Sequence, residues 1–151
     1  MSRRHLLGLT IAIVVAGCGD GFGPGLGFDH ALVTLACGPA DGPAVAFYLA
    51  AHPVDQPSPA FPYITITVWD APTKVAGRTW RLGGSGDTAS AVLVRGVNDY
   101  VVATGGQVSV GVIDTASTTQ GSAVLLFPNV ARVSGSFRAA WRTTPPGPMC
   151  G

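Results

Sequence analysis

The segment Tyr-Ile-Thr-Ile-Thr-Val-Trp-Asp at positions 63–70 alternates more regularly than any other part of the chain. Ile64, Ile66 and Val68 are separated by single threonine residues and flanked by Tyr63 and Trp69. Successive side chains of an extended chain point to opposite faces, so the three aliphatic residues share one side. β-Branched and aromatic residues also suit a pleated, half-buried surface. The segment therefore predicts a β-strand whose aliphatic side faces a core.

The same composition continues on both sides of this segment. Glycine and proline separate the apolar runs, Glu is absent, and Lys74 is the only lysine. The strong helix formers Glu, Lys and Gln are therefore nearly absent. The other runs expected as strands are 32–36, 44–49, 78–82, 89–95, 100–104, 107–114, 121–127 and 131–142. Gly105-Gly106 suits a tight hairpin turn. We expect an all-β fold, a two-sheet antiparallel sandwich of eight or nine strands, with a β-barrel as the alternative.

The start of the chain has the layout of an export signal. Arg3 and Arg4 precede an apolar run from Leu6 to Val15, which is too short for a bilayer span of about 20 residues. Small residues then lead directly to a cysteine, in the order Val15-Ala16-Gly17-Cys18. This order resembles the lipobox of bacterial lipoprotein precursors. The resemblance covers residues 1–18 and implies cleavage after Gly17 and acylation of the Cys18 thiol.

The resemblance divides the chain into three parts. Residues 1–17 are expected to be the signal peptide, residues 18–30 a lipidated cysteine with a glycine-rich tether, and residues 31–151 one domain. The segment from Ser2 to Leu7 is also similar to a twin-arginine export motif, although general secretion is favoured. Gly19 after the acylated cysteine favours the outer membrane if the cell has two. We therefore expect an exported protein held on the membrane through Cys18.

The charge balance excludes one class of partner. Loss of Arg3 and Arg4 with the signal leaves seven basic residues against eight acidic ones, all of them Asp. The charges are scattered along the chain and form no basic cluster. A nucleic-acid-binding domain would carry a basic patch. The sequence therefore predicts no nucleic-acid partner.

Two cysteines remain after Cys18. Cys37 and Cys150 lie near the two ends of the expected domain, in a compartment where disulfides persist. We expect them to be joined. Free thiols or metal ligands are the alternatives, but neither cysteine has the closely spaced Cys or His partner that a zinc site needs.

Candidate catalytic residues are few. The sequence contains no Gly-x-Ser-x-Gly, His-x-x-x-His, Cys-x-x-Cys or phosphate-binding loop. His52 and Asp55 lie in a proline-rich loop, residues 50–62, and are either an acid–base or metal pair or solvated loop residues. The sequence therefore predicts no catalytic residues, no metal and no cofactor.

The last expected strand carries a row of outward residues. Val133, Gly135, Phe137, Ala139 and Trp141 are expected to face inward. The intervening residues, which face water, are Arg132, Ser134, Ser136, Arg138 and Arg142. The arginines are either a stripe for acidic groups or a solvated face that discourages edge pairing.

These observations favour a lipid-anchored, non-catalytic binding or interaction module of the cell envelope. Its expected partner is an envelope protein, a polysaccharide or a small apolar ligand. A carrier of a small apolar ligand or lipid is the first alternative, and it requires an interior cavity. A hydrolase that uses His52 or an Asp is the second alternative.

Overall fold

The computed structural model describes residues 28–84, 88–130, 132–142 and 150. Of these residues, 56% lie in strands and 6% in helices, so the fold is all-β as predicted. The strands are β1 (His30–Cys37), β2 (Pro43–Ala50), β3 (Tyr63–Val68), β4 (Arg78–Leu82), β5 (Ala89–Gly96), β6 (Asp99–Val102), β7 (Gly105–Val110), β8 (Thr118–Leu126) and β9 (Val133–Trp141).

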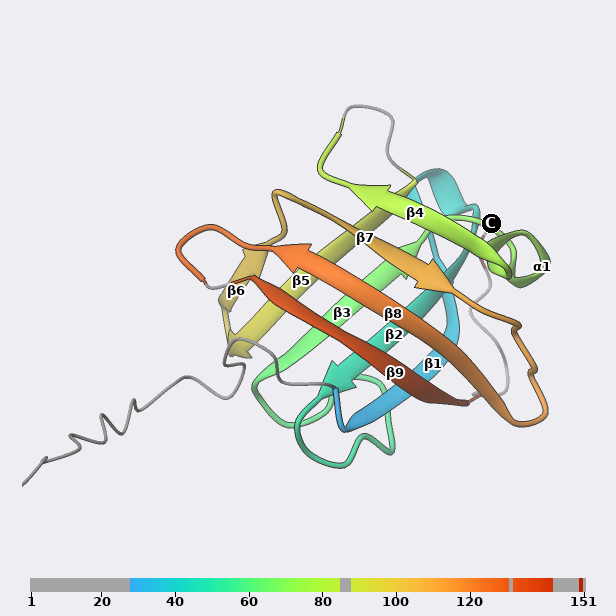
Figure 1. Cartoon of the computed structure of the whole chain (residues 1–151), viewed down its shortest axis with the longest axis horizontal. Helices are drawn as coiled ribbons and strands as arrows, with labels where there is room; N and C mark the ends of the chain where they lie inside the picture. Colours follow the sequence, from blue (N-terminus) through green and yellow to red (C-terminus); the bar gives the residue numbers. More distant parts are fainter. Residues whose placement is uncertain (1–27, 85–87, 131, 143–149, 151) are drawn as a thin grey trace, which may run out of the picture.

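The nine strands form one hydrogen-bonded sheet. Its order is β4-β7-β8-β9-β1-β2-β3-β5-β6. All neighbours are antiparallel except β1 and β9, which run parallel over three positions, Ala31–Val33 beside Ala139–Trp141. The sheet curls into a half-barrel (Figure 1), with β4, β7, β8 and β9 lying over β1, β2, β3 and β5.

The predicted two-sheet sandwich is not confirmed. Two separate sheets would leave β1 and β9 as unpaired edges, whereas here these strands pair and join the two halves into one sheet. The expectation rested on strand number and loop length. Neither property specifies whether two edge strands will pair with each other.

The core lies between the two halves of the curled sheet. Ile64, Ile66 and Val68 of β3 are fully buried, as their alternation predicted. On β9, Phe137 faces inward, and its ring lies 5.4 Å from that of Phe47 on β2. The inward side of β9 also carries the buried Val133 and Ala139 and the partly buried Trp141, as predicted. Burial of large aliphatic and aromatic side chains supplies most of the stability.

One short helix closes part of the core. The helix α1 (Pro72–Val75) connects β3 to β4 and begins with proline, which is favoured at the first helical position. Val75, its one buried residue, belongs to the core cluster. A 3₁₀ turn, η1 (Pro39–Asp41), connects β1 to β2. Within the described residues, no helix has the length and apolar character needed to cross a membrane.

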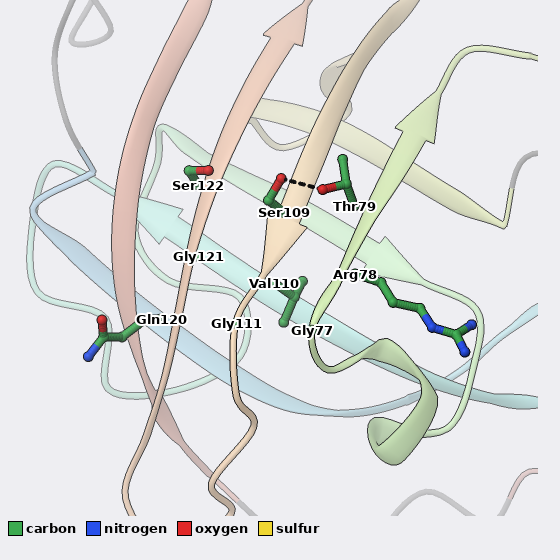
Figure 2. A pocket seen from close by; sticks show the side chains of 9 residues that line it. All are labelled: Gly77, Arg78, Thr79, Ser109, Val110, Gly111, Gln120, Gly121 and Ser122. Atoms are coloured by element: carbon green, nitrogen blue, oxygen red, sulfur yellow. Dashed lines mark hydrogen bonds between the residues drawn. The ribbon is translucent and has the colours of Figure 1, made fainter.

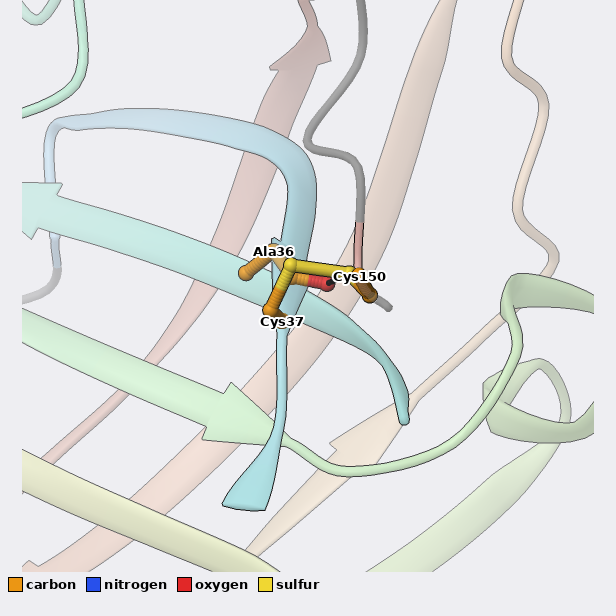
Figure 3. The surroundings of a disulfide bond; sticks show 3 residues. All are labelled: Ala36, Cys37 and Cys150. Atoms are coloured by element: carbon orange, nitrogen blue, oxygen red, sulfur yellow. Dashed lines mark hydrogen bonds between the residues drawn. A yellow bond between two sulfur atoms is a disulfide. The ribbon is translucent and has the colours of Figure 1, made fainter. Parts of the chain in front are cut away.

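Cys37 and Cys150 form the predicted disulfide, shown in Figure 3. Their Cα atoms are 5.5 Å apart, and 113 positions of sequence separate them. The bond joins the end of β1 to the end of the chain. The Cys150 sulfur also lies 3.7 Å from the Ala36 carbonyl oxygen. The two alternatives, free thiols or metal ligands, are therefore excluded.

Two local predictions were wrong. Gly105 and Gly106 do not form a hairpin turn, because β6 pairs with β5 while β7 lies between β4 and β8. Gly106 is instead part of β7 and has φ of 129°, which glycine adopts readily. The expected strand 121–127 also starts earlier than predicted, because β8 begins at Thr118.

The predicted domain boundaries involve residues that are only partly described. The expected signal peptide, Gly17, Cys18 and most of the expected tether lie outside the described residues. Phe28, which falls within the expected tether, is buried in the core cluster, and β1 begins at His30.

Candidate functional site

The residues that the sequence offered as catalytic candidates, His52 and Asp55, do not form a catalytic pair. The His52 ring nitrogen Nε2 lies 2.7 Å from the Ala60 carbonyl oxygen, so this side chain forms a hydrogen bond within its own loop. His52 and Asp55 are not hydrogen-bonded to each other in the described structure. Within the described residues, no three His, Cys, Asp or Glu side chains lie together as a metal site would require.

The most organised polar feature is a row of hydroxyls across four strands. Thr79 on β4 is paired in register with Ser109 on β7, and Ser109 with Ser122 on β8. Ser122 is in turn paired with Ser136 on β9. The positions that alternate with them, such as Val108 and Ala123, are buried in the core cluster. The four hydroxyls therefore share the outward face of the sheet.

A shallow hollow lies beside this hydroxyl row (Figure 2). Its volume is about 480 Å³. Three of its lining residues are glycines on neighbouring chain segments, namely Gly77, Gly111 and Gly121. Backbone hydrogen bonds join these segments, from Gly77 N–H to Gly111 O and from Gly111 N–H to Gln120 O. Gly77 and Gly111 have no side chains to extend into the hollow, whereas the missing side chain of Gly121 is on the core side of the sheet.

The packing around Gly121 requires a glycine at this position. A Cβ on this residue would lie 2.6 Å from the Ser109 carbonyl oxygen and would also collide with the Phe137 ring. The ring approaches this strand from the core side, where it contacts Phe47. Gly121 therefore allows the aromatic core and the outer hollow to lie close together.

A second hollow continues the first toward β9 and the start of β1. Its volume is about 460 Å³, and it shares Gln120 and Gly121 with the first hollow. Ser136 and Arg138 of β9 line it, together with Asp29 and Phe28. We call the two hollows together the cross-strand groove. From β4 to β9 it spans three inter-strand steps, roughly 14 Å at about 4.8 Å each.

Along the hydroxyl row, the chemistry of the cross-strand groove is that of neutral hydrogen bonding. Hydroxyl groups both donate and accept, and the Gln120 amide does the same through separate atoms. Thr79 Oγ1 and Ser109 Oγ already share a hydrogen bond of 2.7 Å. Figure 2 shows the Arg78 side chain pointing away from the hydroxyl row. The second hollow adds one negative and one positive residue, Asp29 and Arg138, which carry no net charge together. The hydroxyl row therefore suits an uncharged ligand with many hydroxyls.

The groove direction also restricts the ligand. A peptide that binds by strand addition lies parallel to the strands and pairs with a free edge. The hydroxyl row runs across the strands, and the backbone groups between neighbouring strands are already paired in the ladders that join β4, β7, β8 and β9. An occupant of the groove must therefore be recognised through side chains.

The predicted arginine row is exposed, but its members differ in position. Arg132, Arg138 and Arg142 are all solvent-exposed, and Ser136 lies outward as predicted. Of the three arginines, Arg138 lines the second hollow. We find no carboxylate within ion-pair distance of any of them in the described residues.

The other half of the sheet presents an uncharged outward face. We call it the aromatic face, and it comprises the outward residues of β2, β3, β5 and β6. The Tyr48 and Tyr63 rings are 6.2 Å apart, and the Phe61 ring stacks on Tyr63 at 5.8 Å. Burial raises the pKa of Tyr48, and the neighbouring Tyr63 raises it further. Tyr100 and Val102 of β6 continue this face at the edge of the sheet.

No protein-family model, curated protein or solved structure matches the chain.

Sequence reasoning missed the cross-strand groove. Ser109, Ser122 and Thr79 each appear as an ordinary outward polar residue of a separate strand. Only the strand order and register bring them into one row. The available signal was that Ser109 and Ser122 each lie between two inward-facing positions of an expected strand.

Proposed function

We propose that this protein is an exported, lipid-anchored module of the cell envelope that binds a linear neutral glycan in the cross-strand groove. The observation that carries the proposal is the register of Thr79, Ser109, Ser122 and Ser136 beside a glycine-lined hollow. A sugar chain presents hydroxyls along its length. It can therefore exchange hydrogen bonds with a row of side chains that crosses several strands.

The alternatives receive less support from the described residues. Both hollows open on the surface, and the inner side of the sheet between them is filled by Phe137 against Phe47. A carrier of an apolar ligand would need an enclosed cavity. A hydrolase would need a base near a nucleophile, but His52 contacts a loop carbonyl oxygen.

We propose that the curled sheet acts as a two-layer sandwich does, with two outward faces that work independently. The cross-strand groove belongs to one face, and the aromatic face belongs to the other.

The glycan proposal is tested by sedimentation of the protein with insoluble chitin and cellulose. The groove variant is Ser109→Ala with Ser122→Ala, and the matched control is Thr67→Val with Ser90→Ala on the other outward face. A net hydrogen bond is worth about 1 kcal/mol, so loss of two should weaken binding by roughly tenfold or more. Equal binding by both variants would contradict the proposal.

The anchor is tested separately. The full chain is produced in a bacterium that is fed a radiolabelled fatty acid. We expect the wild-type chain to carry the label and to sediment with membranes, and Cys18→Ser to lose both properties. Label that persists in the Cys18→Ser variant would place the acylation elsewhere.

A further inference from the structure

The two edges of the sheet differ in charge. At one end of the strand order, β4 carries the exposed Arg78 and Arg81. At the other end, β6 has one charged residue, Asp99, whose carboxylate accepts from Arg95 Nη2 at 2.7 Å and is thereby paired. Charged side chains on an edge strand discourage pairing with another chain. The β4 edge is protected in this way, and the β6 edge is not.

The backbone of β6 offers hydrogen-bonding groups on its free side. The Ala103 N–H, just beyond the strand, donates to the Ala91 carbonyl oxygen of β5 at 2.8 Å. In an antiparallel ladder, alternate residues direct their N–H and C=O groups to opposite sides. Val101 therefore points these groups toward β5, and Tyr100 and Val102 point theirs away from it.

The same two residues present exposed apolar side chains. Tyr100 is 65% exposed and Val102 is 51% exposed, on the aromatic face. Their register partners on β5 are Val94 and Val92, and neither partner is charged. Val101 packs against the core on the inward side. The β6 edge therefore combines free backbone groups with an apolar, uncharged surface.

We propose that the β6 edge is a dimerisation surface, where β6 of a second copy of this chain pairs antiparallel across a twofold axis at Val101. In this register, Tyr100 lies opposite Val102 of the partner subunit and exchanges two backbone hydrogen bonds with it. Tyr100 and the partner's Val102 then share the outward face. Aromatic and β-branched residues are a favourable cross-strand pair.

The register favours a second copy as the occupant. Asp99 falls opposite Ala103 of the partner subunit, so the two copies bring no like charges together. Any register shifted by one residue would place an outward side chain opposite an inward one. Because β6 has four residues, the pairing is short. The dimer should therefore form where copies are concentrated, as on a membrane surface.

The experiment is cysteine cross-linking of the full chain in the membranes of producing cells. Val101→Cys places two thiols at a non-hydrogen-bonded pair, where Cα atoms are about 4.5 Å apart, within the range of a disulfide. Val97→Cys is the control, because it is more exposed (80%) but lies beyond the paired residues. Cells are treated with copper phenanthroline, and the products are separated without reductant. The wild-type chain, treated in the same way, gives the background level of disulfide-linked dimer.

We expect a disulfide-linked dimer for Val101→Cys that is several-fold more abundant than for Val97→Cys. Adding Val102→Pro to Val101→Cys should abolish it, since proline removes an N–H from the free side while the bonds to β5 stay. If that variant does not fold, Val102→Lys tests the same contact through charge. Equal cross-linking at both positions, no dimer at Val101→Cys, or a product with a different protein would overturn the proposal.

Discussion

Two single residues of β8, Gly121 and Thr119, make contacts on the core side of the sheet that affect its stability. Gly121 lies between the Phe137 ring on one side and the hollow on the other. Thr119, two residues earlier, faces the core and is fully buried. Its hydroxyl has no hydrogen-bond partner in the described residues. These two positions lead to opposite predictions for stability.

Gly121→Ala should destabilise the fold. The added methyl group collides with Phe137 and with the Ser109 backbone, which cannot move aside without disturbing β7. Overpacking of this kind costs about 1–3 kcal/mol in unfolding free energy. Urea denaturation measures the change. Gly42→Ala is the matched control, because its Cβ would meet nothing within 4 Å, and equal stability of the two variants would refute the packing argument.

Thr119→Val should stabilise the fold. A buried hydroxyl without a partner costs about 1–3 kcal/mol in lost hydration, and valine replaces it with a methyl group of similar shape. We expect a higher urea midpoint with an unchanged denaturant slope. Thr65→Val, at a half-buried position on the aromatic face, is the comparison. A loss of stability in Thr119→Val would mean that the hydroxyl has a partner in the native protein.

Among the elements, α1 depends on one side chain. Val75 is fully buried in the core cluster, while the neighbouring Lys74 side chain is 67% exposed and makes a 3.7 Å ion pair with Asp70. Val75→Ala should lower the unfolding free energy by about 2 kcal/mol. Lys74→Ala should change it by less than about 0.5 kcal/mol, because exposed ion pairs contribute little. Equal effects in thermal unfolding would show that α1 is not anchored through the core.

The elements also show how far the sequence could predict the fold. Regular alternation predicted β3 and β4 and placed strands at β5 and β6, because a half-buried strand leaves a period of two in its own residues. The same reasoning failed at Gly105-Gly106. Turn chemistry is local, but the partners of β7 are chosen by contacts with distant strands. The polar residues Thr118–Gln120 likewise gave no sign that β8 had already begun.

The candidate site could not be predicted for a related reason. Thr79, Ser109 and Ser122 come from strands that are far apart in the sequence, and their alignment depends on register. The absence of side chains at Gly77 and Gly111 leaves a hollow only when the strands are adjacent. The disulfide was predictable because only two cysteines remain after Cys18 and the expected compartment favours their oxidation, which left one possible pairing.

At the scale of the whole molecule, the disulfide joins the first strand to the end of the chain. The loop it closes spans 113 positions. In the chain-entropy model, such a crosslink stabilises by about 4–5 kcal/mol by restricting the unfolded state. Cys37→Ser with Cys150→Ser should therefore lower the unfolding free energy by several kcal/mol. Thermal unfolding of the two proteins measures the difference, and an unchanged midpoint would contradict this role.

The whole molecule also separates its two outward faces. The polar face with the groove lies on β4, β7, β8 and β9, and the aromatic face ends at the β6 edge. Self-pairing through β6 would leave the groove of each copy open. Glycan binding and dimerisation can therefore fail independently: the groove variant should leave cross-linking at Val101→Cys unchanged.

The most direct test of glycan binding is NMR titration of the isotope-labelled protein with a soluble chitin hexasaccharide and a soluble cellulose hexasaccharide. We predict that one of them shifts the amide signals of Ser109, Gln120 and Ser122 in a saturable manner, while those of Thr65 and Val92 on the aromatic face stay unchanged. Saturable shifts confined to the aromatic face, or no shifts with either sugar, would contradict the assignment of the cross-strand groove as a glycan site.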